Sequence, residues 1–339
     1  MTSAHDEQSP AQFSPDPGGR SFSKKRGVGF EQFGLFMAFV GVFIIISITS
    51  RILRGDWVFL SSINLFNILL HSSMTAIAAV GCTMILVSGN VDLSIGRLVS
   101  MTGIASVYIA NISNSMIVGL IGGLCVGALV GLINGFIVVH LKVNSLIATL
   151  GMMSILLGLV YIVSHARSIP LKVSAMNWLG TGYVGPVPFP VIVTFGIYLL
   201  AYYVMNRTIF GIYVYATGGS NEAAIRSGIH INKIKFITFI VSGVTAALAG
   251  VILAGRLNSG QPRSAAGFEL EVIAATILGG TSLSGGEGHL FGTIIGVLLM
   301  GVMANGLIIM DIDPFWQHVV SGIILIVAVY FDQRRKERT

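Results

Sequence analysis

The chain has 339 residues and a net charge of +6, and 54% of its residues are hydrophobic while only 10% are charged. About a quarter of the residues of a soluble protein are charged, so this composition, with a mean hydropathy of +0.84, excludes an ordinary soluble enzyme. The basic residues flank the apolar runs, a pattern that membrane topology explains and that argues against nucleic acid as a partner.

The first 30 residues are rich in Ser, Pro and Gly and poor in aliphatic residues. Such a composition predicts a disordered tail over residues 1–30. The apolar run that follows has full membrane length and lacks a small-residue cleavage site. We therefore expect it to be retained as a helix rather than removed as a signal peptide.

Ten apolar runs follow one another along the chain. A helix needs about 20 apolar residues to cross a bilayer, and only helices or closed barrels satisfy their backbone groups in lipid. The predicted spans are Phe33–Ser50, Ile68–Ser88, Ile95–Ala110, Met116–Val139, Leu146–Ser164, Val187–Met205, Phe236–Gly255, Val272–Gly286, Leu290–Met310 and Phe315–Phe331. They predict an all-α integral membrane protein, a polytopic helical bundle of about ten transmembrane helices over residues 31–332. We expect short or broken helices near its centre and a basic tail over residues 333–339.

The eighth of these runs, Val272–Gly286, is the weakest candidate. Its 15 residues give about 22 Å of helix, less than the ~30 Å hydrocarbon core. Eight spans remain possible if this segment and one other do not cross.

Lys and Arg residues gather at alternate ends of the predicted spans. Thirteen of the 20 fall on the side of the N-terminus and six on the other side. Because positive charge marks the cytoplasmic side of a membrane protein, we expect both termini in the cytoplasm.

The turn between the second and third spans reads SGNVDLSIG, residues 88–96, and includes a carboxylate. An ionisable residue at membrane depth costs about 2.5–3.5 kcal/mol on insertion scales and needs a partner or a wet cavity. Asn90, Asp92 and Ser94 are therefore candidates for a solute pathway beside a broken helix. The alternative is structural, with Asp92 or Ser94 capping the third span.

Two further asparagines, Asn134 and Asn305, each precede a glycine in similar apolar surroundings. On the predicted topology their helices run in opposite directions, which suggests an inverted repeat. We add both to the candidate pathway, because a polar solute that leaves water needs replacement hydrogen bonds.

The eighth run ends in a glycine-rich stretch in which residues 283–287 spell LSGGE. This pattern resembles the signature of an ATP-binding cassette, but the chain has no GxxxxGK[ST] phosphate loop. We expect no ATP binding by this chain alone and interpret the glycines as a helix break at a close-packed or cavity-lining bend. Glu269 and Glu271 precede the run and are interpreted as acidic caps at the lipid edge.

The longest cytoplasmic loop, residues 206–235, includes a segment that predicts a short helix over Thr217–Ile229. Ser220 or Asn221 can cap its start, Glu222 suits the first turn, and Gly228 can end it in the left-handed conformation. A helix this short is not stable alone in water, so it needs a partner or the bundle to hold it. A surface turn without a partner is the alternative. The residues of interest are Thr217, Gly218, Gly219, Asn221, Glu222, Ala223, Ala224 and Gly228.

The seven His show no metal-ligand spacing, and the sequence has no nucleophile motif. We therefore expect no metal, no cofactor and no catalytic residues in this chain.

Together these segments resemble the membrane permease subunits of bacterial ATP-binding-cassette importers for ribose, arabinose, xylose and related monosaccharides. The matching stretches are SGNVDLSIG, GLINGFIVVHLKVNSLIATLG, ATGGSNEAAIRSGI, RLNSGQP, GFELEVIAATILGGTSLSGGEG and PFWQHVVSGIILIVAVYFDQRRK. The resemblance extends from about Ile68 to Lys336. One departure is Asn90, where the family usually has Gly or another small or acidic residue.

The resemblance implies a homodimer, or a heterodimer with a paralogue, in a bacterial inner membrane. It also implies a tandem ATPase subunit on the cytoplasmic face, a periplasmic sugar-binding protein outside, and a Thr217–Ile229 segment that acts as the coupling helix. Import of a nucleoside, a signalling furanose, a branched-chain amino acid or another small polar solute by the same type of importer is the alternative. An ion-coupled secondary transporter is disfavoured, because only Asp92 and Arg97 approach intramembrane charges.

Overall fold

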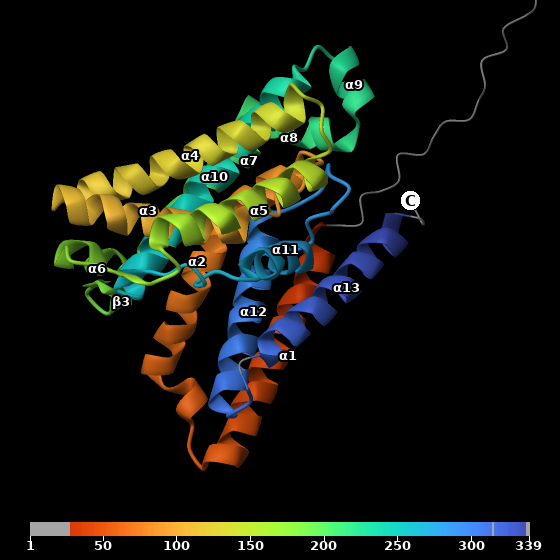
Figure 1. The fold of residues 1–339 in the computed structure, drawn as a ribbon. Coiled ribbons are helices and arrows are strands. Elements are labelled where there is room, and N and C mark those ends of the chain that lie inside the picture. The colour runs from red at the N-terminus through yellow and green to blue at the C-terminus, as the bar shows by residue number, and fades with distance from the viewer. Residues whose placement is uncertain (1–27, 314, 337–339) are drawn as a thin grey trace, which may run out of the picture.

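A computed structural model of the chain describes residues 28–313 and 315–336 (Figure 1). The predicted N-terminal tail lies outside the described residues up to position 27, and its last three positions begin the first helix. Residues 333–336 of the predicted basic tail belong to the last helix, which ends at Lys336.

Nine helices in the described part of the chain are long and apolar enough to cross a membrane. They are α1 (Val28–Arg54), α2 (Ser62–Val87), α3 (Ile95–Ser113), α4 (Met116–Val139), α5 (Ser145–Ser164), α7 (Phe189–Arg207), α10 (Ile231–Arg256), α12 (Leu290–Ile309) and α13 (Trp316–Lys336). The short helices are η1 (Val58–Leu60), α6 (Ser174–Thr181), α8 (Ile209–Gly219), α9 (Asn221–Arg226) and α11 (Phe268–Leu278). Two antiparallel pairs complete the described elements: β1 (Ile169–Pro170) with β4 (Ser259–Gly260), and β2 (Tyr183–Val184) with β3 (Val187–Pro188). The prediction of an all-α polytopic bundle is confirmed.

The eighth predicted span is wrong as a membrane-length helix. In its place stands α11, which has 11 residues and a length of about 16 Å, half of the hydrocarbon core. It ends at Leu278 because Gly279 packs against the backbone of α12 and Gly280 adopts a φ of +86°, a conformation that glycine enters readily. The described residues thus hold nine long helices and one half-length helix in place of ten spans.

α11 nevertheless carries the chain through half of the bundle. Residues 257–267 turn back into the bundle after α10, and there the Ala265 N–H donates to Ser100 Oγ of α3 at 3.3 Å. α11 therefore starts partway along α3. Eight residues after α11 ends, the Gly286 N–H donates to the carbonyl of Val87, the last residue of α2, at 2.9 Å.

As a result, the first turn of α1 and the last turn of α13 lie at the same end of the bundle, which also carries α8 and α9 (Figure 1). We name this the α9 end. The opposite end, with α6 and the short strands, is named the α6 end.

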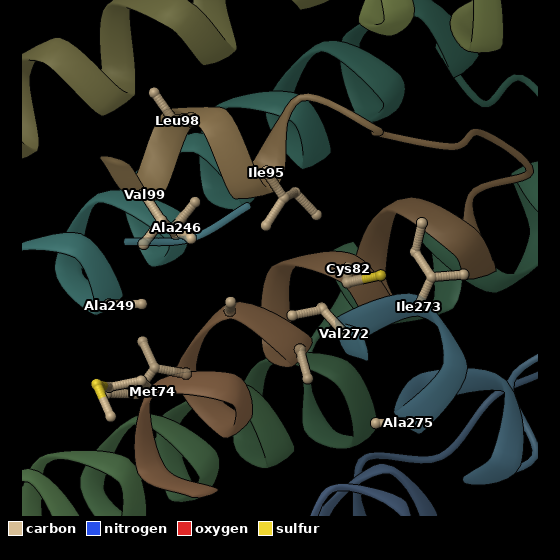
Figure 2. Close-up of a cluster of buried hydrophobic side chains, with 14 of the residues drawn as sticks. Met74, Cys82, Ile95, Leu98, Val99, Ala246, Ala249, Val272, Ile273 and Ala275 are labelled. Carbon is tan, nitrogen blue, oxygen red and sulfur yellow. The ribbon is translucent and has the colours of Figure 1, made fainter. Parts of the chain in front are cut away.

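The centre of the bundle is built from α2 and α10, which are buried over most of their lengths. Figure 2 shows apolar side chains of α2, α3, α10 and α11 packed into one cluster that includes Cys82. Around this core α4, α5 and α7 expose many large apolar side chains. Gly127 and Gly131 of α4 lie so close to the α10 backbone that a Cβ would not fit, as expected of helices packed through small residues in lipid.

Candidate functional site

The turn between α2 and α3, residues 88–94, is held by side chains of the neighbouring α5. The Val91 N–H donates to Ser145 Oγ at 3.3 Å, and the Leu93 N–H donates to Thr149 Oγ1 at 3.1 Å. Val91 and Leu93 lie between the two helices, so their N–H groups have no partner within a helix. The side chains of α5 supply the hydrogen-bond acceptors that buried backbone groups require.

Asp92 is the centre of a hydrogen-bond network in this turn, and its residue is only 3% exposed. Asp92 Oδ1 accepts from the Ser94 N–H at 2.9 Å and from Ser94 Oγ at 2.6 Å, and Oδ2 accepts from Ser242 Oγ of α10 at 2.9 Å. Asn134 of α4 donates through Nδ2 to Ser94 Oγ at 3.0 Å. The network ties α3, α4 and α10 together and fits the structural alternative, because Asp92 holds Ser94, the N-cap residue of α3.

The remaining candidate pathway residues lie apart from this network. Asn90 donates to the carbonyl and hydroxyl of Ser88 at 3.3 and 3.2 Å within the same turn. Asn305 lies toward the C-terminal end of α12 and exchanges two hydrogen bonds, of 2.8 and 3.0 Å, with Asn64 of α2. The structure therefore brings Asp92, Ser94 and Asn134 together, keeps Asn90 nearby, and separates Asn305 from all of them.

The predicted short helix of the coupling segment is α9, and the first three residues of the segment, 217–219, form the end of α8. α8 ends at Gly219, and α9 begins at Asn221 after Ser220, whose Oγ accepts from the Ala223 N–H at 3.2 Å. Gly228 has the left-handed φ of +78° that was expected of it. The break arises because Ser220 adopts an extended conformation and caps α9.

The eight candidate coupling residues fall into two groups by exposure. Thr217 and Ala224 are buried against the bundle, and Gly218 packs against the turn after α2. Asn221, Glu222 and Ala223 are exposed, and Glu222 pairs with Arg226 one turn later at 4.0 Å. One face of α9 is thus free for a partner, and the other connects to the bundle.

Three glycine turns meet where α8 touches the bundle. A Cβ on Gly218 would overlap the Val87 carbonyl and the Gly286 N–H, and a Cβ on Gly285 would overlap Gly89. Gly285 and Gly286 have φ values of +87° and +78°. We name Gly89, Gly218, Gly285 and Gly286 the glycine junction; it joins the turn after α2, the end of α8 and the turn after α11.

The turn between α11 and α12 contains the LSGGE stretch and is tied on both sides. Asp332 of α13 accepts from Ser282 Oγ at 3.0 Å and from the Leu283 N–H at 3.3 Å. Tyr215 of α8 donates to the Gly288 carbonyl at 2.7 Å, and burial raises the pKa of its phenol, so the hydroxyl stays a donor. The stretch serves as a helix break at a close-packed bend, as expected from its glycines.

Residues 64–329 match the family described as branched-chain amino acid transport system / permease component. The chain belongs to this permease family. No solved structure matches the chain.

Curated relatives of this permease carry the names of sugar importers. The chain is 37% identical over 302 residues to the ribose import permease protein RbsC of Escherichia coli K12, which covers 88% of this chain and 93% of that protein. It is 36% identical over 308 residues to the L-arabinose transport system permease protein AraH of the same strain, covering 91% and 92%. The ribose import permease protein RbsC of Bacillus subtilis is 35% identical over 303 residues, covering 88% and 92%.

Three residues that help to position the candidate site carry no local sequence signal. Ser242 in α10, Tyr215 in α8 and Asp332 in α13 each bond to a turn distant in sequence. No local pattern signals these contacts. Only the burial of Asp92, which needs several donors, could have prompted a search for Ser242.

Proposed function

We propose that this chain is the membrane permease subunit of an ATP-driven importer that takes up a monosaccharide delivered by an external binding protein. The observation that carries the proposal is the similarity, over about nine-tenths of each chain, to proteins named as ribose and arabinose import permeases. The long apolar helices of the described residues supply the membrane domain that such a subunit needs.

ATP hydrolysis is assigned to a separate ATPase subunit that docks at the α9 end. The exposed face of α9, with Asn221, Glu222 and Ala223, offers the contact surface. Since Lys and Arg residues are more frequent on the side of the predicted N-terminus, we assign the α9 end and both chain termini to the cytoplasm.

The coupling signal then runs from α9 through the glycine junction. Backbone meets backbone at Gly218, Gly286 and Val87 without intervening side chains, so a displacement of α8 moves both attached turns. One of these turns holds the Asp92 network, and the other continues into α11. The half-length helix α11 packs on α2, α12 and α13, so a movement of the glycine turn after it can be passed to three long helices.

Two copies of the chain, or one copy and a paralogue, surround the pathway in this proposal. A periplasmic sugar-binding protein docks at the α6 end of the bundle, and lipid covers the exposed apolar side chains of α4, α5 and α7. A neutral sugar is favoured over a nucleoside or an amino acid, because the relatives described above are named for pentoses.

Co-purification tests the assignment of the ATPase contact. The permease is expressed with its partner ATPase and binding protein, and the wild type is compared with Glu222→Lys. The Glu222 side chain is 87% exposed, so we expect the variant to insert into the membrane normally. We expect it to retain about tenfold less ATPase, because a reversed charge at an interface loses favourable contacts and can place like charges side by side. Equal retention by both proteins would place the contact elsewhere. Thermal-shift screening of the binding protein against monosaccharides, nucleosides and amino acids then identifies the solute class.

A further inference from the structure

A small polar cavity lies beside the start of α11, at the α6 end of the bundle. It has a volume of about 150 Å³ and is lined by α2, α10, α11, α13 and the segment before α11. Its polar lining includes His71, Thr75, Arg256, Glu271, Gln317 and His318. We name this cavity the outer chamber.

The chamber is organised around the Glu271 carboxylate. Thr75 of α2 donates to Glu271 Oε1 at 2.9 Å, which joins the buried central helix to the first turn of the half-length helix. Arg256 at the end of α10 lines the same cavity. One carboxylate and one guanidinium leave the chamber without a net charge when the histidines are neutral, an arrangement suited to a neutral solute with many hydroxyl groups.

We propose that the outer chamber is the site where the permease receives a single neutral monosaccharide, with Glu271, Thr75 and Arg256 as its main hydrogen-bonding groups. The proposal rests on the proposed function above and specifies its solute site. An apolar cavity of about 150 Å³ in another protein holds one benzene molecule, so a chamber of this size has room for a single ring. A nucleoside, with a base and a sugar, exceeds it.

The position of the chamber agrees with a receiving site. Transporters commonly bind solute where a discontinuous helix begins inside the membrane, and α11 is such a helix in this bundle. Its opposite end joins the glycine junction. The same helix thus forms a wall of the chamber and ends at the turn that contacts α8.

Two other regions are less suited to hold the sugar. In the Asp92 network Ser94 and Ser242 already bond to both carboxylate oxygens, which leaves Asn134 Oδ1 as an unpartnered acceptor. A larger cavity, about 660 Å³, lies between α2, α7, α8 and α12; eight of its lining residues carry polar groups, among them the unpartnered hydroxyls of Ser72 and Tyr198, but none of them is Asp, Glu, Lys or Arg.

The first test measures sugar transported per ATP hydrolysed by the complete complex in proteoliposomes. Glu271→Gln and Thr75→Val alter the chamber, while Glu269→Gln alters a carboxylate of the same helical turn that packs against Gly96 and lies outside the chamber lining. A sugar that is held less well escapes while ATP turnover continues, so we expect the ratio to fall roughly three- to tenfold in the first two variants. Glu269→Gln should retain the wild-type ratio. Equal ratios in all variants would overturn the proposal.

The second test reports on the chamber without requiring transport. Ser321 of α13 also lines the chamber, and Ser321→Cys in a Cys125→Ser background is treated with a small hydrophilic thiol reagent from outside. We expect labelling to slow more with the sugar-loaded than with the sugar-free binding protein, whereas labelling of Thr181→Cys, an exposed position of α6 where the binding protein docks, should respond equally to both. Failure of the reagent to reach Ser321→Cys would overturn the chamber. A wild-type complex that imports no monosaccharide although Ser321→Cys is labelled would contradict the proposed function instead.

Discussion

Most buried polar side chains in the described part of this permease form hydrogen bonds with other groups of the protein. Asp92 accepts three hydrogen bonds from Ser94 and Ser242, and each bond to a charged group contributes about 1.5–3 kcal/mol. Their sum offsets the insertion cost of about 2.5–3.5 kcal/mol. At the residue scale, we therefore infer a structural role for Asp92, which positions Ser94, the N-cap residue of α3.

Replacing Asp92 tests this role. Asp92→Ala leaves the Ser94 N–H and the Ser242 hydroxyl without their acceptor, so we expect the free energy of unfolding to fall by about 2–4 kcal/mol. Thermal unfolding in detergent measures the loss, and sugar uptake per assembled complex should stay near the wild-type value. A variant of wild-type stability that no longer transports would return Asp92 to the solute pathway.

Elements differ in how far the sequence determines them. The long helices could be predicted because each is an apolar run of membrane length, such as Met116–Val139, which α4 reproduces residue for residue. The coupling segment could be predicted from its cap Ser220 and its stop Gly228. The bounds of α11 could not be predicted from the sequence. Its end depends on contacts of Gly279 with α12, and its start depends on a chain segment that turns back into the bundle.

In the candidate site, too, some features could be predicted from local sequence and others depend on helix packing. The residues of the Asp92 turn were recognisable as polar groups between apolar helices, but their hydrogen-bond partner Ser242 lies 150 positions away. Asn305 has a similar local sequence to Asn134, yet it pairs with Asn64 toward the other end of the bundle. The sequence indicates which polar residues lie in apolar runs and therefore need hydrogen-bond partners. Which residues become those partners depends on how the helices pack.

Two adjacent glycines of the coupling loop provide a matched test of the glycine junction. A Cβ on Gly218 overlaps the Val87 carbonyl, whereas a Cβ on Gly219 meets open space. We expect Gly218→Ala to reduce sugar-stimulated ATPase activity severalfold while the complex still assembles, because the turns it joins are forced apart. Gly219→Ala is the control and should behave as wild type. If both variants show normal stimulation, coupling does not pass through the junction.

At the scale of the whole molecule, the bundle places α9 and both described ends of the chain together, and places α6 at the opposite end (Figure 1). This arrangement follows from α11, which returns the chain through half of the bundle between α10 and α12. The two ends can therefore face the partners proposed for them, an ATPase at α9 and a binding protein at α6.

Single-cysteine labelling in intact cells tests the sidedness of this arrangement. In a Cys125→Ser background, a membrane-impermeant thiol reagent should label Thr181→Cys on α6 and should leave Asn221→Cys on α9 unlabelled until the cells are opened. Both positions are exposed in the structure, so access depends on the membrane alone. Labelling of Asn221→Cys in intact cells would reverse the assigned orientation.

ATP-dependent uptake is the measurement that tests the central claim most directly. Proteoliposomes that hold the permease with its ATPase, and that receive the sugar-loaded binding protein from outside, are supplied internally with ATP, with a non-hydrolysable analogue, or with an imposed proton or sodium gradient and no ATP. We predict accumulation of a labelled monosaccharide with ATP alone. Accumulation driven by an ion gradient in the absence of ATP, or no accumulation of any monosaccharide with ATP, would contradict the account.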